Sequence, residues 1–386
     1  MQKLNPTFDI IIVGAGVVGA ACAAECARAG LKVLVLDRGP VGGGTTGAGM
    51  GHLVVMDDSE AQFVLTRYSR ELWNNLAPDL PKAIEYVQCG TLWVAADDQE
   101  MAEVRRKASF YTQRGVRVEV LDAAGVAAAE PNLRPGLVGG LRVVEDAVLY
   151  PPCAARWLIE LALARKAQVR TATAVTALLP EGGVILADGS RLSADAVVNA
   201  AGPWSPALHP GLPVRKRKGH LAVTERYTGY VHHQIVELGY LKSAHSVGTD
   251  SVAFNVQPRQ TGQVLIGSSR QYDAEGTEIN TPILQRMLRR ALEYMPGLGR
   301  LTVTRCWTGH RAATPDKLPL IGPTPGNNKL WLATGHEGLG ITTCLGTGRL
   351  LADLLLKRPT EIPAEPYAPA RLLRALETKP QECVIS

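Results

Sequence analysis

The sequence predicts an α/β fold in which a sheet of parallel strands is joined to a second, α+β part built on an antiparallel sheet. Three observations predict this fold. An apolar run at 9–13 leads through a glycine turn and a helical segment into a second apolar run at 31–36, which is the order of a βαβ unit. A further apolar run at 194–199 ends in small residues and glycine, as a buried parallel strand does. From about 221 to 305 short strand-like runs alternate, which is typical of an antiparallel sheet with one solvated face.

The glycine turn carries the strongest chemical signal. Its sequence, GAGVVG, starts at Gly14 directly after the first apolar run, and the second run ends at Asp37. Gly14 allows the tight turn, Gly16 lets the backbone approach a pyrophosphate, and Gly19 lets the helix pack closely on the strand. The free N–H groups and the dipole of the helix start bind phosphates, and Asp37 accepts hydrogen bonds from ribose hydroxyls. In this context the motif predicts a Rossmann-like dinucleotide-binding domain rather than a βαβ unit without a ligand.

The remaining elements follow from periodicity and from the positions of glycine and proline. The first helix, 17–28, is rich in small residues, which lets it lie close to the sheet, and Gly30 supplies its C-cap. A loop dense in glycine covers 39–51. We expect further helices at 62–76, 97–114, 281–294 and 346–356, and strands at 91–96, 173–178, 183–186, 252–256 and 263–267.

Composition excludes several classes of protein. The 386 residues are 46% hydrophobic and carry a net charge of +5, with acids and bases interleaved. The densest basic run, 215–218, is typical of a solvated strand edge or an anion contact, so we expect no nucleic-acid partner. No stretch approaches the roughly 20 apolar residues that span a bilayer. The chain enters its first strand within about ten residues, which leaves no room for a signal peptide.

The cysteines indicate a reducing compartment. There are seven, scattered along the chain, which favours free thiols over a disulfide framework. Cys22 and Cys26 share a helix face at a spacing that a metal can use, but the alanines around them favour buried packing. We therefore predict a cytoplasmic protein with no metal site and no iron–sulfur cluster of its own.

Three glycine-rich segments suit one large planar ligand: the phosphate turn, 42–51 and 334–342. The hydroxyls of Thr45 and Thr46 can donate to a pyrophosphate, and the glycines let the backbone pass against a ring. The helix after the third segment would place partial positive charge beside a flavin pyrimidine ring, which stabilises the reduced, anionic flavin. Ordinary turns explain either loop alone, but the two together favour a flavin over a nicotinamide.

These residues carry a resemblance to a known family. The chain resembles the D-amino-acid oxidase and glycine oxidase superfamily of FAD-dependent oxidoreductases. The shared motifs are GAGVVG with Asp37, GGGTTGAGMG at 42–51, AAGPW at 200–204, GHRAATPD at 309–316 followed by PLIG at 319–322, and GHEGLG at 335–340. They occur in family order over nearly the whole chain. Within the superfamily the chain is most similar to the flavin subunits of bacterial D-hydroxyproline dehydrogenases.

The resemblance implies a Rossmann-like FAD-binding domain and a second α+β substrate domain built on an antiparallel sheet. We expect 1–82, 145–220 and 306–386 in the discontinuous FAD-binding domain, and 83–144 and 221–305 in the substrate domain. We expect noncovalent FAD, because Gly309 falls near the place where sarcosine oxidase relatives carry a cysteine bonded to the flavin, and Cys306 is three residues away. The candidate cofactor-binding residues are Gly14, Gly16, Val17, Val18, Gly19, Asp37, Arg38, Gly44, Thr45, Thr46, Gly49, Met50, Gly51, Val175, Ala200, Ala201, Gly202, Trp204, Gly335, His336, Glu337, Gly338, Leu339, Gly340, Ile341 and Thr342.

The resemblance also implies how the substrate is held. In glycine oxidase-like enzymes the arginine of the matching motif anchors the substrate carboxylate, and Arg311 takes that place. The alternative is that Arg311 holds its own loop through Asp316. Family members often add a tyrosine from a strand of the substrate domain. The matching stretch has none, so either Asn255 replaces it or Tyr240 reaches in from elsewhere. His52 either lines the flavin ring or is structural.

The implied function is an FAD-dependent dehydrogenase that oxidises the C–N bond of a small amino or imino acid, above all cis-4-hydroxy-D-proline, by hydride transfer to the flavin. No external base is required, because a neutral amine can release hydride directly. We expect an oligomer, cytoplasmic or at the periphery of the inner membrane, that passes electrons to partner subunits carrying flavin and an iron–sulfur centre. Three alternatives stay open. They are a stand-alone glycine, sarcosine or D-amino-acid oxidase that produces hydrogen peroxide, a subunit of an opine oxidase or hydrogen cyanide synthase, and an FAD-bound scaffold without catalysis.

Overall fold

A six-stranded sheet forms the first part of the fold. The computed structural model describes residues 8–239, 250–272 and 274–377. The strand order is β18-β19-β12-β1-β2-β8, and every neighbouring pair is parallel except β18–β19. The strands are β1 (Phe8–Val13), β2 (Val33–Leu36), β8 (Gln168–Arg170), β12 (Ala194–Asn199), β18 (Leu320–Thr324) and β19 (Asn327–Thr334). The central strands β1, β2 and β12 are apolar runs that are almost entirely buried, as expected for parallel strands covered on both faces.

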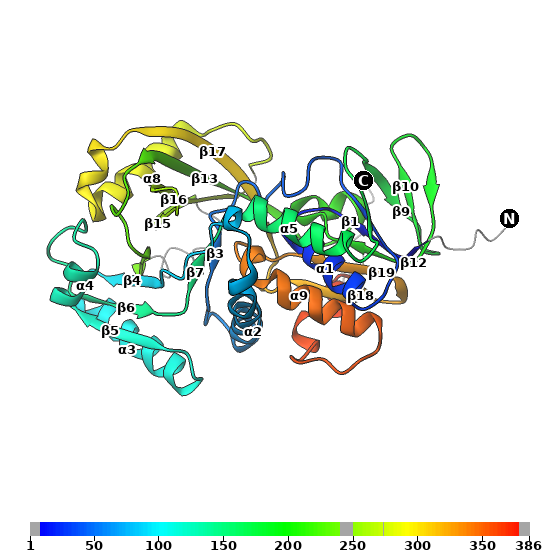
Figure 1. The fold of residues 1–386 in the computed structure, drawn as a ribbon, viewed down its shortest axis with the longest axis horizontal. Helices are drawn as coiled ribbons and strands as arrows, with labels where there is room; N and C mark the ends of the chain where they lie inside the picture. Colours follow the sequence, from blue (N-terminus) through cyan, green and yellow to red (C-terminus); the bar gives the residue numbers. More distant parts are fainter. Residues whose placement is uncertain (1–7, 240–249, 273, 378–386) are drawn as a thin grey trace, which may run out of the picture.

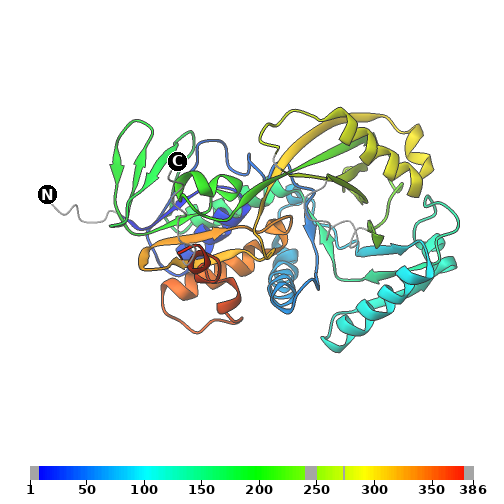
Figure 2. The same ribbon diagram turned by 180° about the vertical axis from the view of Figure 1, so that it is seen from behind.

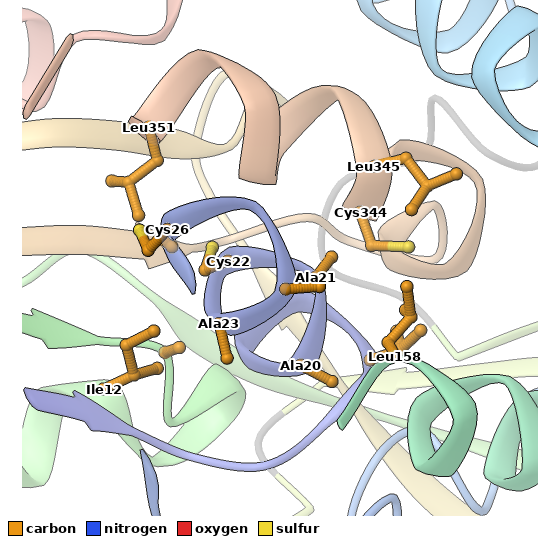
Figure 3. Packing of buried hydrophobic residues seen from close by; sticks show 14 of the residues in the cluster. Ile12, Ala20, Ala21, Cys22, Ala23, Cys26, Leu158, Cys344, Leu345 and Leu351 are labelled. Atoms are coloured by element: carbon orange, nitrogen blue, oxygen red, sulfur yellow. The ribbon is translucent and has the colours of Figure 1, made fainter. Parts of the chain in front are cut away.

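Helix α1 (Val17–Arg28) is the centre of the core next to this sheet. It packs between β1, α5 (Pro151–Leu163) and α9 (Gly340–Leu355), and Figure 3 shows its alanines and cysteines facing all three elements. Cys22 and Cys26 are fully buried, and burial raises the pKa of Cys26 to about 12, so this thiol is protonated at neutral pH and packs as a small apolar side chain. The small side chains let α1 lie close to its neighbours, as the sequence predicts.

Helix α9 begins six residues earlier than the predicted start at 346. Gly346 and Gly348 were expected near the helix start, but they lie inside it. A β-carbon on Gly348 would stand 2.7 Å from the carbonyl oxygen of Ala21, and one on Gly346 would stand 3.1 Å from a methyl of Leu65. These glycines therefore allow α9 to approach α1 and α2 (Glu60–Leu76), which outweighs their low helix propensity.

An eight-stranded sheet forms the second part (Figures 1 and 2). Its order is β17-β13-β16-β15-β14-β4-β6-β5, and every pair is antiparallel except β14–β4. The strands are β4 (Thr91–Ala95), β5 (Val118–Asp122), β6 (Gly139–Val143), β13 (Arg215–Arg226), β14 (Gln234–Glu237), β15 (Ser251–Pro258), β16 (Gln263–Tyr272) and β17 (Val303–Ala313). This sheet confirms the predicted fold class, an α/β parallel sheet with a second part on an antiparallel sheet.

Helices pack on both faces of this second sheet. Helix α8 (Thr281–Tyr294) packs on it, and the ring of Tyr294 stacks on that of Phe254 with centroids 4.7 Å apart. Helix α4 (Ala123–Ala129) packs on the same face as α8, whereas α3 (Asp98–Gln113) packs on the opposite face, beside Trp93 and Leu141. Side chains alternate across a strand, so Phe254 faces α8 while its neighbour Asn255 faces the opposite side. The opposite side faces the functional site.

Small elements complete the fold. The sheet β9-β10-β11 consists of Val175–Leu178, Val184–Leu186 and Arg191–Leu192, and β3 (His52–Leu53) pairs with β7 (Ala147–Val148). The remaining α-helices among the described residues are α6 (Ser205–Leu208) and α10 (Ala370–Glu377). Helix α2 starts two residues before the predicted position because Ser59 caps it, accepting a hydrogen bond from the backbone N–H of Gln62. None of the described helices is both long and apolar enough to cross a membrane.

Candidate functional site

One cavity of about 830 Å³ lies where the two large sheets meet. Its lining comes from the phosphate turn, the loop at 43–50, the end of β12, the loop at 335–341, and the face of the eight-stranded sheet opposite α8. The three glycine-rich segments, which are far apart in the sequence, therefore line a single space. The candidate residues below are described by what they contact there.

The phosphate turn has the shape that its glycines require. Gly14 has a φ of +115°, and a β-carbon there would stand 2.5 Å from the carbonyl oxygen of Ala200. A β-carbon on Gly19 would collide with the carbonyl oxygen of Gly14. The Asp37 carboxylate accepts the backbone N–H of Ala15 at 2.6 Å and that of Gly39 at 2.7 Å. It thus fixes the turn and still lines the cavity with lone pairs left for a ligand.

The two threonines of the second segment differ in their hydrogen bonds. Thr46 Oγ1 accepts the backbone N–H of Val17 at 2.9 Å, which leaves its own proton for a ligand at the start of α1. Thr45 Oγ1 donates to the carbonyl oxygen of His310 at 2.8 Å, so its proton joins this loop to β17. We expected both threonine hydroxyls to donate to a ligand, but only that of Thr46 keeps its proton for this purpose.

The far end of the cavity is lined by Arg38, Val175 and Trp204, with Gly44 against the indole. The guanidinium of Arg38 lies 4.5 Å from the Trp204 ring centroid. A cation stacked on an indole makes a flat, positively charged wall. This wall suits the adenosine half of a dinucleotide.

The third segment forms a tight loop that leads into α9. Gly335 has a φ of +81°, and a β-carbon there would stand 2.5 Å from Thr314. The Nε2 of His336 lies 3.0 Å from Thr347 Oγ1, and burial lowers the pKa of His336 to about 3, so this ring is neutral. Glu337 forms a buried ion pair with Arg217. Residues from Gly338 to Ile341 bring the N-terminus of α9 to the cavity.

Three candidate cofactor residues support the cavity without lining it: Gly19, Gly51 and Thr342. A β-carbon on Gly51 would collide with the carbonyl oxygen of Leu149. Thr342 Oγ1 donates to the carbonyl oxygen of His52 at 2.8 Å, which holds β3 against α9. Every other candidate cofactor residue lines the cavity.

Arg311 occupies the cavity side of β17. Its Nη1 donates to the carbonyl oxygen of Ser269 at 3.0 Å, and the guanidinium lies over Gly219. Asp316, the alternative partner, is instead bound by Arg371, with Nε 2.6 Å from Oδ2. The guanidinium of Arg311 is thus directed into the cavity by the sheet rather than by its own loop.

Two more predicted substrate residues also line this cavity. Burial, reinforced by the charge of Arg311 and opposed by Gln234, lowers the pKa of His52 to about 4, so the imidazole is neutral at neutral pH. Asn255 is 8% exposed, and its Oδ1 has no hydrogen-bond partner among the described residues. Buried polar atoms are nearly always paired, so this atom indicates a ligand. Tyr240 lies outside the described residues.

Sequence reasoning missed Trp93 and Trp307, which both line the cavity. Trp307 Nε1 donates to the carbonyl oxygen of Ala48 at 3.3 Å and so holds the second glycine segment. The sequence predicts the strand that contains Trp93, but the place of Trp93 on the same row as Asn255 depends on strand pairing, for which the sequence has no local signal.

The lining fits a flavin dinucleotide. The glycines provide a cradle that β-carbons would fill, Thr46 offers a hydroxyl proton, and α9 directs its N-terminus at the cavity. Neither of the two positions weighed for a covalent link, Gly309 and Cys306, presents a thiol to the cavity. A β-carbon on Gly309 would collide with Ala48, and Cys306 packs into the core on the other face of β17.

Comparisons with known proteins give matches over most of the chain. Residues 9–354 match the profile of the family described as DAO, FAD dependent oxidoreductase. The chain is 30% identical over 435 aligned residues to a D-amino acid dehydrogenase of Methylobacterium nodulans, which covers 95% of this chain and 99% of that one. It is 26% identical to a hydrogen cyanide synthase subunit of Pseudomonas protegens, over 97% of this chain and 99% of that one. The crystal structure of glycine oxidase from Geobacillus kaustophilus superimposes with a TM-score of 0.85 at 25% identity, covering 94% and 98% of the two chains.

Proposed function

We propose a function from one premise: the chain belongs to the DAO family of FAD dependent oxidoreductases. On that premise it is a dehydrogenase that oxidises the C–N bond of a small amino or imino acid. The observation that carries this proposal is the position of Arg311. Its guanidinium lines the same cavity as the glycine cradle and is held by the carbonyl oxygen of Ser269.

The side chains divide the work of holding such a substrate. Arg311 binds the carboxylate, because a guanidinium stays charged and can form two parallel hydrogen bonds to it. His52 is neutral at neutral pH and adds no second positive charge beside the amine, so the amine is bound in its uncharged form more readily. Bound FAD would supply the acceptor for a hydride, that is, a hydrogen with its bonding electron pair, from the carbon beside the nitrogen. With a proton lost from nitrogen as well, the substrate becomes a C=N compound.

We propose cis-4-hydroxy-D-proline as the substrate and partner subunits with flavin and an iron–sulfur centre as the electron acceptor. The resemblance to D-hydroxyproline dehydrogenases supports the substrate. The relative named as a hydrogen cyanide synthase subunit supports the idea that chains of this kind work in complexes. The alternatives are a stand-alone glycine, sarcosine or D-amino-acid oxidase that reduces dioxygen to hydrogen peroxide, and a subunit of an opine oxidase or hydrogen cyanide synthase.

We further propose the division of the chain into an FAD-binding domain of 1–82, 145–220 and 306–386 and a substrate domain of 83–144 and 221–305. Every strand of the six-stranded sheet falls in the first set of ranges, and β4, β5, β6, β14, β15 and β16 fall in the second. Strands β13 and β17 cross the limits at 220 and 306, and in Figures 1 and 2 they reach from the second sheet toward the first.

The test is anaerobic mixing of the purified, FAD-loaded protein with D- and L-amino acids, prolines and N-methyl amino acids. Flavin absorbance should fall fastest with cis-4-hydroxy-D-proline. Turnover in air only with dyes or partner chains supports the dehydrogenase, and hydrogen peroxide from the isolated chain supports the oxidase. If no amino or imino acid bleaches the flavin, the proposal fails and the chain is an FAD-bound scaffold.

A further inference from the structure

We propose that Asn255 and Trp93 recognise a hydroxyl group on the substrate, at the side of the cavity away from its carboxylate. This inference rests on the proposed function, since it assumes that a small amino or imino acid is anchored by Arg311. It assigns Asn255 to the substrate side chain rather than to the carboxylate. Trp93 has no role in the proposal so far.

Strand pairing places the two residues on one row of the eight-stranded sheet. Trp93 of β4 pairs with Val236 of β14, and Val236 pairs with Asn255 of β15. Residues directly opposite each other on neighbouring strands have side chains on the same face. All three residues line the cavity, so the row faces the bound ligand.

Each end of this row has an unpaired polar atom of opposite kind. Asn255 is 8% exposed and its Oδ1 has no partner among the described residues, and Trp93 is 3% exposed and its Nε1 has none either. Asn255 Oδ1 needs a hydrogen-bond donor, and Trp93 Nε1 needs an acceptor. A carboxylate only accepts and an ammonium only donates, so each would leave one atom unpaired. A hydroxyl does both.

The position of Asn255 relative to Arg311 fits a small substrate. Arg311 Nη1 is held by the carbonyl oxygen of Ser269 on β16, which marks the carboxylate end of the site. Asn255 lies on the next strand opposite Gly267, which is two residues from Ser269. From the ordinary spacing of strands, the two backbone positions are roughly 8 Å apart. A five-membered ring with its carboxylate at Arg311 therefore presents a substituent on its far side to Asn255.

A charged side chain from α3 holds the Trp93 ring in place. The ammonium of Lys107 lies 5.1 Å from the centroid of the Trp93 ring, and Lys107 is held in a buried ion pair with Asp57. This contact fixes the orientation of the indole before a ligand arrives. A donor that is already oriented discriminates between ligands with and without the matching acceptor.

The test compares cis-4-hydroxy-D-proline with D-proline as reductants of the FAD-loaded protein under anaerobic conditions. In the wild type, the reduction rate divided by Kd should favour the hydroxylated compound by roughly 100-fold or more. Asn255→Leu and Trp93→Phe should each lower that preference by about tenfold or more, mainly by raising the Kd of the hydroxylated compound. Val236→Ala, between them on the same row, is the matched control and should affect both compounds alike.

A second measurement separates recognition from folding. Tetrahydrofuran-2-carboxylate has neither an oxidisable amine nor a hydroxyl, and its binding can be followed by the change that it causes in flavin absorbance. Its Kd should be the same in the wild type, Asn255→Leu and Trp93→Phe. Equal reduction by proline and hydroxyproline in the wild type, or a loss of tetrahydrofuran-2-carboxylate binding in both variants, overturns the inference while leaving the proposed function intact. If no imino acid reduces the flavin, the proposed function fails, and the inference fails with it.

Discussion

The guanidinium of Arg311 lies directly over Gly219. A β-carbon at position 219 would stand 2.5 Å from Nη1 and 3.0 Å from Cζ of Arg311. The two residues belong to neighbouring strands, β13 and β17, and Gly219 pairs with Gly309 in the register of that pair. The absence of a side chain at 219 therefore sets the height of the guanidinium above the sheet and brings it within reach of the carbonyl oxygen of Ser269.

Gly219→Ala should weaken substrate binding without removing any charged group. The new methyl displaces the guanidinium, and charge-assisted hydrogen bonds contribute about 1.5–3 kcal/mol each, so losing one raises the Kd about 10- to 100-fold. The measurement is the substrate dependence of flavin reduction. Gly299→Ala is the matched control, because a β-carbon there makes only an ordinary contact of 3.4 Å with Leu292. An unchanged Kd in Gly219→Ala would show that Arg311 does not contact the substrate.

Arg311→Lys should keep the positive charge and lose the paired hydrogen bonds. We expect the Kd of the substrate to rise about 10-fold or more, with a smaller change in the limiting rate of flavin reduction. Arg311→Met, which removes the charge, should raise the Kd of the substrate further. The ratio of bound FAD to protein should stay at the wild-type value in both variants. A fall in the limiting rate alone, with Kd unchanged, would contradict a role in binding the carboxylate.

The local features of this site could be predicted from the sequence, and the long-range ones could not. GAGVVG, Asp37 and the apolar runs around them form one contiguous unit, so their spacing alone predicts the turn that the structure contains. By contrast, the roles of Thr45 and Trp93 depend on the partners that the fold brings to them. Thr45 donates to a residue 265 positions away in the sequence.

The start of α9 illustrates how packing can override a local residue preference. Gly346 and Gly348 are glycines because α1 and α2 approach α9 closely, a requirement that only the packed structure reveals. The predicted helix, 346–356, starts six residues after the observed start of α9. Arg311 could be singled out from its motif, but the choice between a ligand role and a bond to Asp316 needed the observation that Arg371 already binds Asp316.

FAD should leave the protein on acid denaturation. Precipitation with acid should give a yellow supernatant and a colourless pellet, because Gly309 has no side chain and Cys306 packs on the face of β17 away from the cavity. Gly309→Cys should not create a covalent link, because its β-carbon would collide with Ala48. We expect that variant to lose FAD and melt at a lower temperature. Yellow colour in the wild-type pellet would contradict the noncovalent assignment.

Stability should fall as the pH drops below about 6.5, and His336 should account for part of the loss. Burial lowers the pKa of His336 from its ordinary 6.5 to about 3, so between these values the unfolded chain binds a proton that the folded chain does not. The stabilisation is complete above 6.5 and is lost progressively toward 3, by up to about 1.4 kcal/mol per pH unit. His336→Gln replaces the ring with a side chain that cannot titrate. In urea unfolding at pH 7.5 and pH 5, the free energy of unfolding should therefore fall less in His336→Gln than in the wild type, by about 2 kcal/mol. Equal losses in the two proteins would show that this histidine is already protonated in the folded state.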